Sequence, residues 1–338
     1  MKQIIVSFLC ALAVLTADAQ FLFRISGGGL EKPSYILGTI HTLPGTVLDS
    51  IPEYLEIEAQ CQQLYAELEF TKEKASNVMG SAASLQTKEI LPDGKTIYDI
   101  LSKEQINMLK SVISKELTAT WKTITEVKAR SGGVSNRTID DATISTRAES
   151  LVTQMQIFMP NTFMSFIDGM INMEVLMQSL DKDIMNNQLI DIVCISRAKA
   201  RGMTIGELDE TSDLLELLGK NNNLSLEAQV DSLARYLTTF EQHRQNSIDE
   251  VKYIKQTIEY WNKGDFDTFS TMDYLVTSAE KELTHDKKRS ETWLPKMITA
   301  MHKAPTLFAF GSAHLIGPYS IIQKLRDAGY DVEQIKKN

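Results

Sequence analysis

Residues 34–41 read SYILGTIH and residues 306–314 read TLFAFGSAH, so two apolar segments near opposite chain ends each run into a Gly-x-x-His turn. Each segment has the length of a buried strand, and the glycine lets the backbone bend sharply or approach a neighbouring strand closely. Functional groups in α/β sheets gather at the carboxyl ends of the strands. We therefore predict that the two segments are neighbours or next-neighbours in one sheet and that His41 and His314 open into one cleft.

The pair of turns is more informative than either turn alone. About 0.25 Gly-x-x-His matches are expected by chance in a chain of this glycine and histidine content, yet two of the five histidines fall in such a turn. The other three, His243, His285 and His302, stand in polar or helical contexts and are predicted to be surface residues. From the pattern alone, two histidines satisfied by backbone carbonyls remain the alternative to a shared site.

Further strand candidates lie near the same two chain ends. Residues 21–26 (FLFRIS) are closed by the glycines 27–29, and residues 64–70 (LYAELEF) follow. Residues 203–208 (MTIGEL) form a later candidate, and residues 330–335 (YDVEQI) a possible edge strand. Apolar runs separated by helices are typical of a mainly buried α/β sheet.

Helical sequence fills the space between the strand candidates, and a capping box at Ser102-x-x-Gln105 marks one helix start. The sequence thus predicts an α/β fold with an α+β tendency, in which a central mixed sheet built from both chain ends carries a large helical insertion. We expect a signal peptide at 1–19 and a single domain at 20–338, with sheet segments at about 20–70, 203–210 and 306–335 and helical insertions at about 72–200 and 224–304.

The N-terminus has the features of an export signal. Lys2 gives a basic start, residues 4–15 are apolar, and Ala17-Asp18-Ala19 is a small-residue cleavage site. The apolar stretch is shorter than the ~20 residues that span a bilayer, and a buried first strand or helix is the alternative interpretation. We expect cleavage after Ala19 and an exported protein, periplasmic or extracellular, without a membrane span after cleavage.

The formal net charge of -9 argues against nucleic acid and anionic membrane surfaces as partners. After cleavage only Cys61 and Cys194 would remain of the cysteines. Two cysteines are no disulfide framework, and their spacing matches no zinc motif. A single bridge and two buried thiols therefore both stay open.

The motifs together resemble the TraB/GumN/Tiki family, which includes PrgY-type proteins and Tiki-like metalloproteases. The family has two Gly-x-x-His turns, matched here by Gly38 and Gly311 with their histidines, and a strand with a glutamate, matched by Glu67 and Glu69. Arg289 stands on a helix similar to the family's arginine-bearing helix. The similarity covers about residues 21 to 335, and its further matches are residues 91–102 (LPDGKTIYDILS), 197–209 (RAKARGMTIGELD) and 310–317 (FGSAHLIG).

The chain departs from the family pattern at three points. Ser290 stands where an asparagine often follows the arginine, and Asn186 or Asn187 where an aspartate is common ahead of the helix before the later strand. Pro160-Asn161 replaces a common Pro-Trp. The first two departures bear on activity, and the third on the helical region, where we expect substrate choice.

The resemblance implies a metal-dependent hydrolase, and it favours peptide cleavage because animal Tiki proteins are described as metal-dependent proteases. Two imidazoles and a carboxylate suit a hydrolytic divalent ion and leave a position for water. His41, Glu67 and His314 are the predicted ligands. These ligand types do not distinguish manganese, cobalt and zinc.

Two further roles fall to three charged side chains outside that ligand set. Glu69 or Asp209 would transfer protons, and Arg289 would stabilise developing negative charge. For each acid, an exposed or paired carboxylate is the alternative, and for Arg289 a solvated helix charge.

Rival functions use the same residues. The histidines and glutamate could activate water without a metal, as in esterases of related fold. The protein could instead bind a peptide without cleaving it, or bind haem through the paired histidines. In each case the partner is a peptide or another small molecule.

Overall fold

The computed structural model describes residues 21–68, 90–130, 140–179, 188–210, 224–272 and 283–336, without the side chains of 127–130 and 283–286. The predicted signal peptide and Glu69 lie outside these ranges, as do Asn186 and Asn187.

A six-stranded mixed sheet lies at the centre of one half of the described molecule, in the order β4-β3-β5-β2-β1-β6. The four strands β4, β3, β5 and β2 are parallel, and β1 and β6 complete the sheet in antiparallel pairings. This confirms the predicted α/β class with a sheet built from both chain ends. The strands are β1 (Leu22–Gly27), β2 (Ser34–Thr39), β3 (Gln63–Ala66), β4 (Thr204–Glu207), β5 (Thr306–Gly311) and β6 (Tyr330–Gln334).

Strands β2 and β5 are direct parallel neighbours, with Gly38 opposite Phe310 and Thr39 opposite Gly311. The prediction that the two segments share one sheet is therefore confirmed. Because the strands are parallel and in this register, both Gly-x-x-His turns leave the sheet at the same edge.

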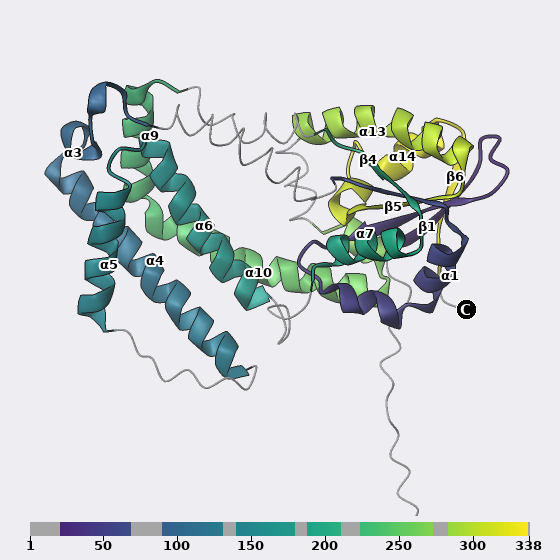
Figure 1. Ribbon diagram of the computed structural model, residues 1–338, viewed down its shortest axis with the longest axis horizontal. Helices are drawn as coiled ribbons and strands as arrows, with labels where there is room; N and C mark the ends of the chain where they lie inside the picture. The colour runs from purple at the N-terminus through teal and green to yellow at the C-terminus, as the bar shows by residue number, and fades with distance from the viewer. Residues whose placement is uncertain are drawn as a thin grey trace, which may run out of the picture.

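Helices cover both faces of the sheet (Figure 1). Helices α1 (Pro52–Gln60) and α7 (Ile190–Ala200) lie on one face, and α13 (Leu283–Lys303) and α14 (Ile321–Asp327) on the other. Every residue of β2 and β5 is buried as a result, which explains why their sequences are continuously apolar instead of alternating.

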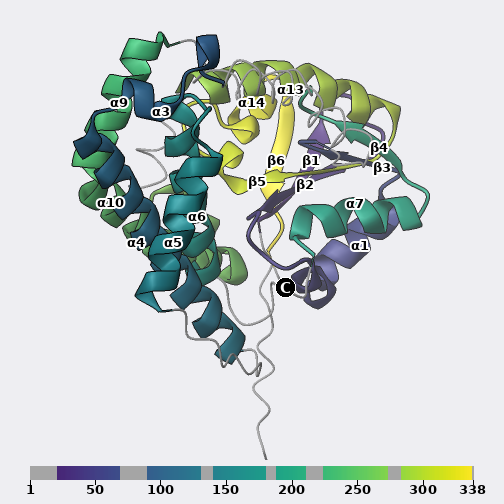
Figure 2. The ribbon, with the colours of Figure 1, turned by 60° about the vertical axis from the view of Figure 1, so that its left-hand side comes forward.

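A second hydrophobic core lies in a helical half of the molecule (Figures 1 and 2). It is built on residues such as Leu109, Phe163 and Leu233. Its helices are α3 (Ile97–Ile100), α4 (Lys103–Arg130), α5 (Asp141–Gln154), α6 (Pro160–Ser179), α9 (Leu226–Thr238) and the first part of α10 (Phe240–Lys263).

Helix α10 connects the helical half to the sheet. Its residue Trp261 is fully buried in the core around the sheet, and the indole Nε1 donates to the carbonyl oxygen of Gly38 at 2.6 Å. The short α11 (Phe266–Ser270) follows it. The remaining short elements are the 3-10 helices η1 (Gly45–Ser50), η2 (Pro92–Gly94) and η4 (Ser312–Leu315).

Cys61 and Cys194 are both free and buried, so the two-thiol interpretation holds. Burial raises the pKa of each thiol to about 12. Within the described ranges, we find no helix with the length and apolar content that crossing a membrane requires.

Candidate functional site

The two Gly-x-x-His turns need their glycines because other atoms approach them closely. A Cβ on Gly38 would lie 2.5 Å from Cδ1 of Leu315, which is closer than packed carbon atoms come. A Cβ on Gly311 would lie 3.0 Å from Nε2 of His41 and 3.3 Å from Oε1 of Glu67. The first glycine therefore permits packing of the core, and the second leaves space between two candidate site residues.

His41, two residues beyond the end of β2, is oriented by an aspartate on α7. Its Nδ1 lies 2.9 Å from Oδ2 of Asp191, whose Oδ1 accepts from the hydroxyl of the buried Thr39 at 2.8 Å. Because a carboxylate only accepts, Nδ1 carries the proton and Nε2 of a neutral His41 is left as an acceptor. The hydrogen bond to Asp191 outweighs burial and raises the pKa of His41 above its usual value.

Glu67, directly after β3, lies between the two histidines. Its Oε1 is 3.8 Å from Nε2 of His41 and 3.9 Å from Nε2 of His314. The backbone N–H of Gly311 also donates to Oε1, at 2.8 Å. Burial disfavours the charged carboxylate, but the cation of Arg289 and this N–H oppose that effect, and the pKa of Glu67 lies below its usual value.

His314 in η4 is the more buried of the two histidines, with 10% of its side chain exposed against 59% for His41. Its Nε2 lies 2.7 Å from Nη1 of Arg289. A guanidinium can only donate, so this Nε2 accepts and the imidazole is neutral. Burial is the main reason that the pKa of His314 falls to about 4.

Arg289 on α13 joins the acids to His314. Its Nη2 donates to Oε2 of Glu67 at 2.5 Å and also to Oδ2 of Asp209, and its Nε lies 3.2 Å from both oxygens of Asp209. Trp293, one helical turn further, donates from Nε1 to Oδ1 of Asp209 at 2.6 Å. Asp209 and Trp293 thus fix the direction of the guanidinium.

This arrangement changes the interpretation of Asp209. We expected Asp209 as one of two candidates for proton transfer, but its carboxylate is only 8% exposed and is occupied by Arg289 and Trp293. Its position favours a role in holding Arg289. Glu69, the other candidate, lies outside the described residues.

The donor atoms suit a divalent ion in type, although no group of three or more His, Cys, Asp or Glu side chains in the described ranges is arranged to hold one. His41, Glu67 and His314 offer two imidazole nitrogens and a carboxylate oxygen, the ligand types of hydrolytic zinc sites. The hydrogen bond from His41 to Asp191 is also the outer contact typical of a ligand histidine. However, Nε2 of His314 already accepts from Arg289, so ligation by His314 would require the guanidinium to move away.

The structure brings together His41, Glu67, Arg289, His314 and Asp209, all of which were singled out from the sequence. Sequence reasoning missed Asp191, Thr39 and Trp293. The position of the family's aspartate was matched to Asn186 or Asn187, whereas the aspartate that contacts His41 stands a few residues later, in the first turn of α7. The acidic first turn of that predicted helix was the available signal.

The chain is similar to one known protein family and to several named relatives. A model of the TraB/PrgY/gumN family matches residues 21–334. The chain is 22% identical to a protein of Nematostella vectensis named "Metalloprotease TIKI homolog", over 90% of this chain and 65% of the relative. It is 21% identical to "Metalloprotease TIKI2" of Danio rerio, over 93% of this chain and 60% of the relative.

A further relative, "Metalloprotease TIKI1" of Xenopus tropicalis, is 20% identical over 89% of this chain and 59% of the relative. The chain therefore spans about three fifths of the length of these curated relatives. No solved structure shows a significant match to the chain.

Proposed function

Because the chain belongs to the TraB/PrgY/gumN family, we propose that it is a peptide hydrolase whose reaction takes place at the carboxyl ends of β2, β3 and β5. The observation that carries the proposal is the approach of His41 and His314 to the same oxygen of Glu67, within 4 Å each, beside the cation of Arg289. The names of the relatives above favour a peptide bond as the bond that is broken and a metal as the cofactor.

His41, Glu67 and His314 are the residues that would hold a divalent ion, manganese, cobalt or zinc. A bound ion would supply Lewis-acid polarisation and a more acidic water. Asp191 keeps Nε2 of His41 unprotonated towards the site when the ring is neutral. The lowered pKa of Glu67 keeps its carboxylate ionised at neutral pH, so that it remains able to bind an ion or to accept a proton.

Arg289 would stabilise the negative charge that develops on the carbonyl oxygen of the substrate. Its guanidinium is fixed by Asp209 and is largely buried, with 18% of the side chain exposed. A fixed cation in a water-poor site favours a charged transition state because little reorganisation is needed. Arg289→Lys would keep a positive charge but lose the fork of parallel donors.

A second candidate function, hydrolysis without a metal, is favoured by the contact between Arg289 and His314. In that mechanism Nε2 of His41 takes a proton from water, and Asp191 stabilises the imidazolium that results, as a carboxylate does behind a catalytic histidine. The hydrogen bond to Asp191 raises the pKa of His41, which makes its ring a stronger base.

Elemental analysis of the purified protein and a peptide-cleavage screen with and without chelator distinguish the two. We expect a divalent ion near one per chain and a loss of cleavage on chelation. His41→Ala and His314→Ala should each lower metal content and reduce turnover by at least about 100-fold. His302→Ala is the matched control, because His302 is exposed and contacts Tyr330 instead of the site.

If both histidine variants lose turnover and the wild-type protein never contains metal, the metal-free mechanism is selected. Wild-type turnover in both variants would refute the assignment of His41 and His314 to the reaction centre. Peptide binding that is never followed by cleavage would leave a binding protein in place of an enzyme.

We also propose that the protein acts outside the cytoplasm, on the basis of Lys2, the apolar residues 4–15 and the small residues before Gln20.

A further inference from the structure

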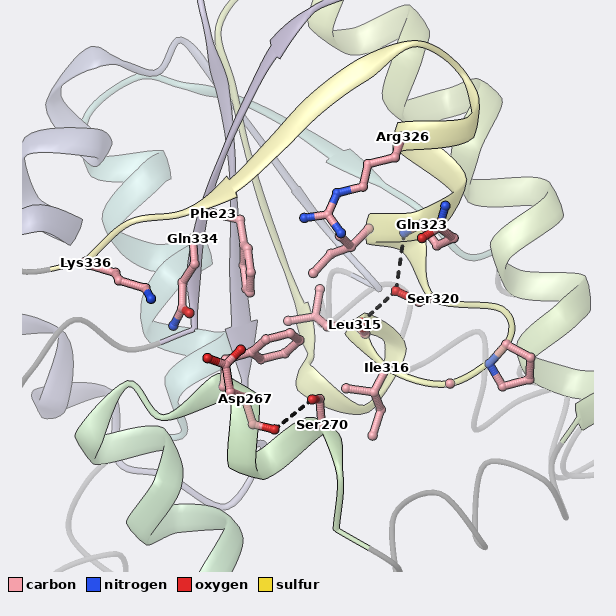
Figure 3. Close-up of a pocket in the computed structure, with 14 residues that line it drawn as sticks. Phe23, Asp267, Ser270, Leu315, Ile316, Ser320, Gln323, Arg326, Gln334 and Lys336 are labelled. Carbon is pink, nitrogen blue, oxygen red and sulfur yellow. Dashed lines mark hydrogen bonds between the residues drawn. The ribbon is translucent and has the colours of Figure 1, made fainter.

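A cavity separate from the histidine site lies beside the β1–β6 edge of the sheet (Figure 3). It has a volume of about 480 Å³, within the range of ~300–1,000 Å³ that small-molecule sites occupy. Its walls come from β1, α11, α14, the end of β6 and the loop after η4. No residue of the proposed reaction centre lines it.

Apolar side chains form one part of this wall. Phe23 and Ile316 are 2% and 7% exposed, whereas Phe266 is only partly buried. The rings of Phe23 and Phe266 pack edge to face, with centroids 4.9 Å apart and an interplanar angle of 78°. The pair is therefore a rigid apolar surface, and Phe266 keeps part of its ring available to an occupant.

Charged side chains form the other part of the wall. Arg326, Lys336 and Asp267 are the charged residues that line the cavity, and all three are exposed. Within the described part of the chain, Asp267 forms no ion pair with either cation, and Lys336 has no hydrogen-bond partner. Arg326 uses Nη2 for the carbonyl oxygen of Val332, at 2.7 Å, so the guanidinium is held in place with other donors left over.

The lining charges add up to one net positive charge in a chain whose own charge is -9. This excess favours an anionic occupant, and a fixed guanidinium matches the planar geometry of a carboxylate. Polar groups stand on two sides of the apolar surface, with Gln323 and Arg326 on α14, and with Gln334 at the end of β6 and Lys336 two residues after it (Figure 3). An occupant that is polar at two points, such as a peptide unit, uses both sides, whereas a fatty acid is polar at one end only.

We propose that this cavity binds the carboxy-terminal residue of a peptide, with an apolar side chain against Phe23 and Phe266 and the carboxylate at Arg326. On the opposite side, Lys336 donates to the carbonyl oxygen of the peptide unit, since the amide nitrogens of Gln323 and Gln334 already donate to Asp327 at 2.7 Å and to the carbonyl oxygen of Gly264 at 2.8 Å. The wall of the cavity includes Leu315, the residue directly after His314, so an occupant contacts the segment that carries the histidine.

Calorimetric titration of the intact chain with N-acetyl-leucine and with N-acetyl-leucinamide tests the proposal. The acid should bind at least about tenfold more tightly than the amide, because hydrogen bonds to a charged acceptor are the stronger ones. Arg326→Gln should weaken binding of the acid and leave binding of the amide unchanged, whereas Lys336→Gln should weaken binding of both. Asp267→Asn should strengthen binding of the acid, a gain that damage to the fold would not produce.

Lys32→Gln is the matched control, because Lys32 is an exposed cation that lines a different cavity. Equal binding of acid and amide would overturn the proposal, as would an unchanged affinity in the Lys336 variant. If octanoate binds as tightly as N-acetyl-leucine, the occupant of the cavity is a fatty acid and the peptide proposal is wrong. These measurements require no turnover, so they can fail or succeed independently of the proposed hydrolase.

Discussion

At the scale of single residues, the contact between His41 and Asp191 predicts how the charge of the His41 ring and the stability of the protein depend on pH. Asp191→Asn keeps an acceptor for Thr39 but removes the charge that raises the pKa of His41, so this pKa should fall. A raised histidine pKa contributes stability that is fully present below the unfolded value of ~6.5 and is lost as pH rises through the folded value. The variant should lose this contribution, and titration of the His41 ring by NMR measures the change.

Asp168→Asn is the control for that experiment. Asp168 accepts from His243 at 2.9 Å in the helical half, so its loss should leave the titration of His41 unchanged. An unchanged His41 titration in Asp191→Asn would show that the contact does not set the charge of the ring.

Replacement of the two turn glycines by alanine should have different effects, on stability at Gly38 and on turnover at Gly311. Gly38→Ala forces Leu315 and Phe21 apart inside the core, and overpacking of this kind costs about 1–3 kcal/mol in the free energy of unfolding. Gly311→Ala meets the end of the exposed His41 side chain, which can move. It should change stability by less than about 1 kcal/mol but lower turnover, since Glu67 and His41 are displaced. Denaturant unfolding and peptide-cleavage assays on the same preparations separate the two effects; equal loss of stability in both would contradict this account.

At the scale of helices, a buried ion network fixes α4, α6 and α10 to one another. Arg244 donates from Nε to Glu116 at 2.6 Å and from Nη2 to Glu174 at 2.5 Å, and both carboxylates are almost fully buried. Arg244→Ala leaves these charges without their partner, which should cost about 3–5 kcal/mol in the free energy of unfolding. Lys115→Ala, which removes the exposed contact with Glu241 between the same helices α4 and α10, should cost less than about 1 kcal/mol.

The cost of Arg244→Ala should depend on pH. Burial raises the pKa of Glu116 despite Arg244, so the folded carboxyl holds its proton to higher pH than the unfolded one. Such a group favours folding most below the unfolded value of ~4.3 and loses that contribution as pH rises through the folded value. Removing Arg244 raises the folded value further, so the deficit should be larger at pH 7 than at pH 4. Thermal unfolding followed by circular dichroism at both pH values measures this difference.

At the scale of the whole molecule, the N-terminal sequence predicts that the functional protein starts at Gln20. Mass spectrometry of the protein collected outside the producing cells should show this new N-terminus, because the apolar stretch and the small residues at 17–19 are what a signal peptidase reads. Recovery of the chain with Met1 intact would refute export by cleavage.

The sequence by itself determined the two central strands β2 and β5, their burial and one helix start. Continuous apolar runs predicted β2 and β5 because a strand covered on both faces has no polar side to show. The capping box at Ser102 forms as the spacing predicts, with Ser102 N–H donating to the Gln105 side chain at 2.8 Å and the reverse contact at 3.1 Å. These features depend on neighbours within a few residues, so the sequence contains all the information they need.

Only the tertiary structure decided how the site residues are paired. His41 meets Asp191 across 150 positions of sequence, and Arg289 meets Glu67 across 222. Asp209, a candidate for proton transfer in the sequence, contacts both Arg289 and Trp293, because α13 packs these two side chains against the end of β4. Periodicity along one segment states which face is buried but not which side chain of another segment lies against it. Those partners are set by the packing of α7 and α13 on opposite faces of the sheet.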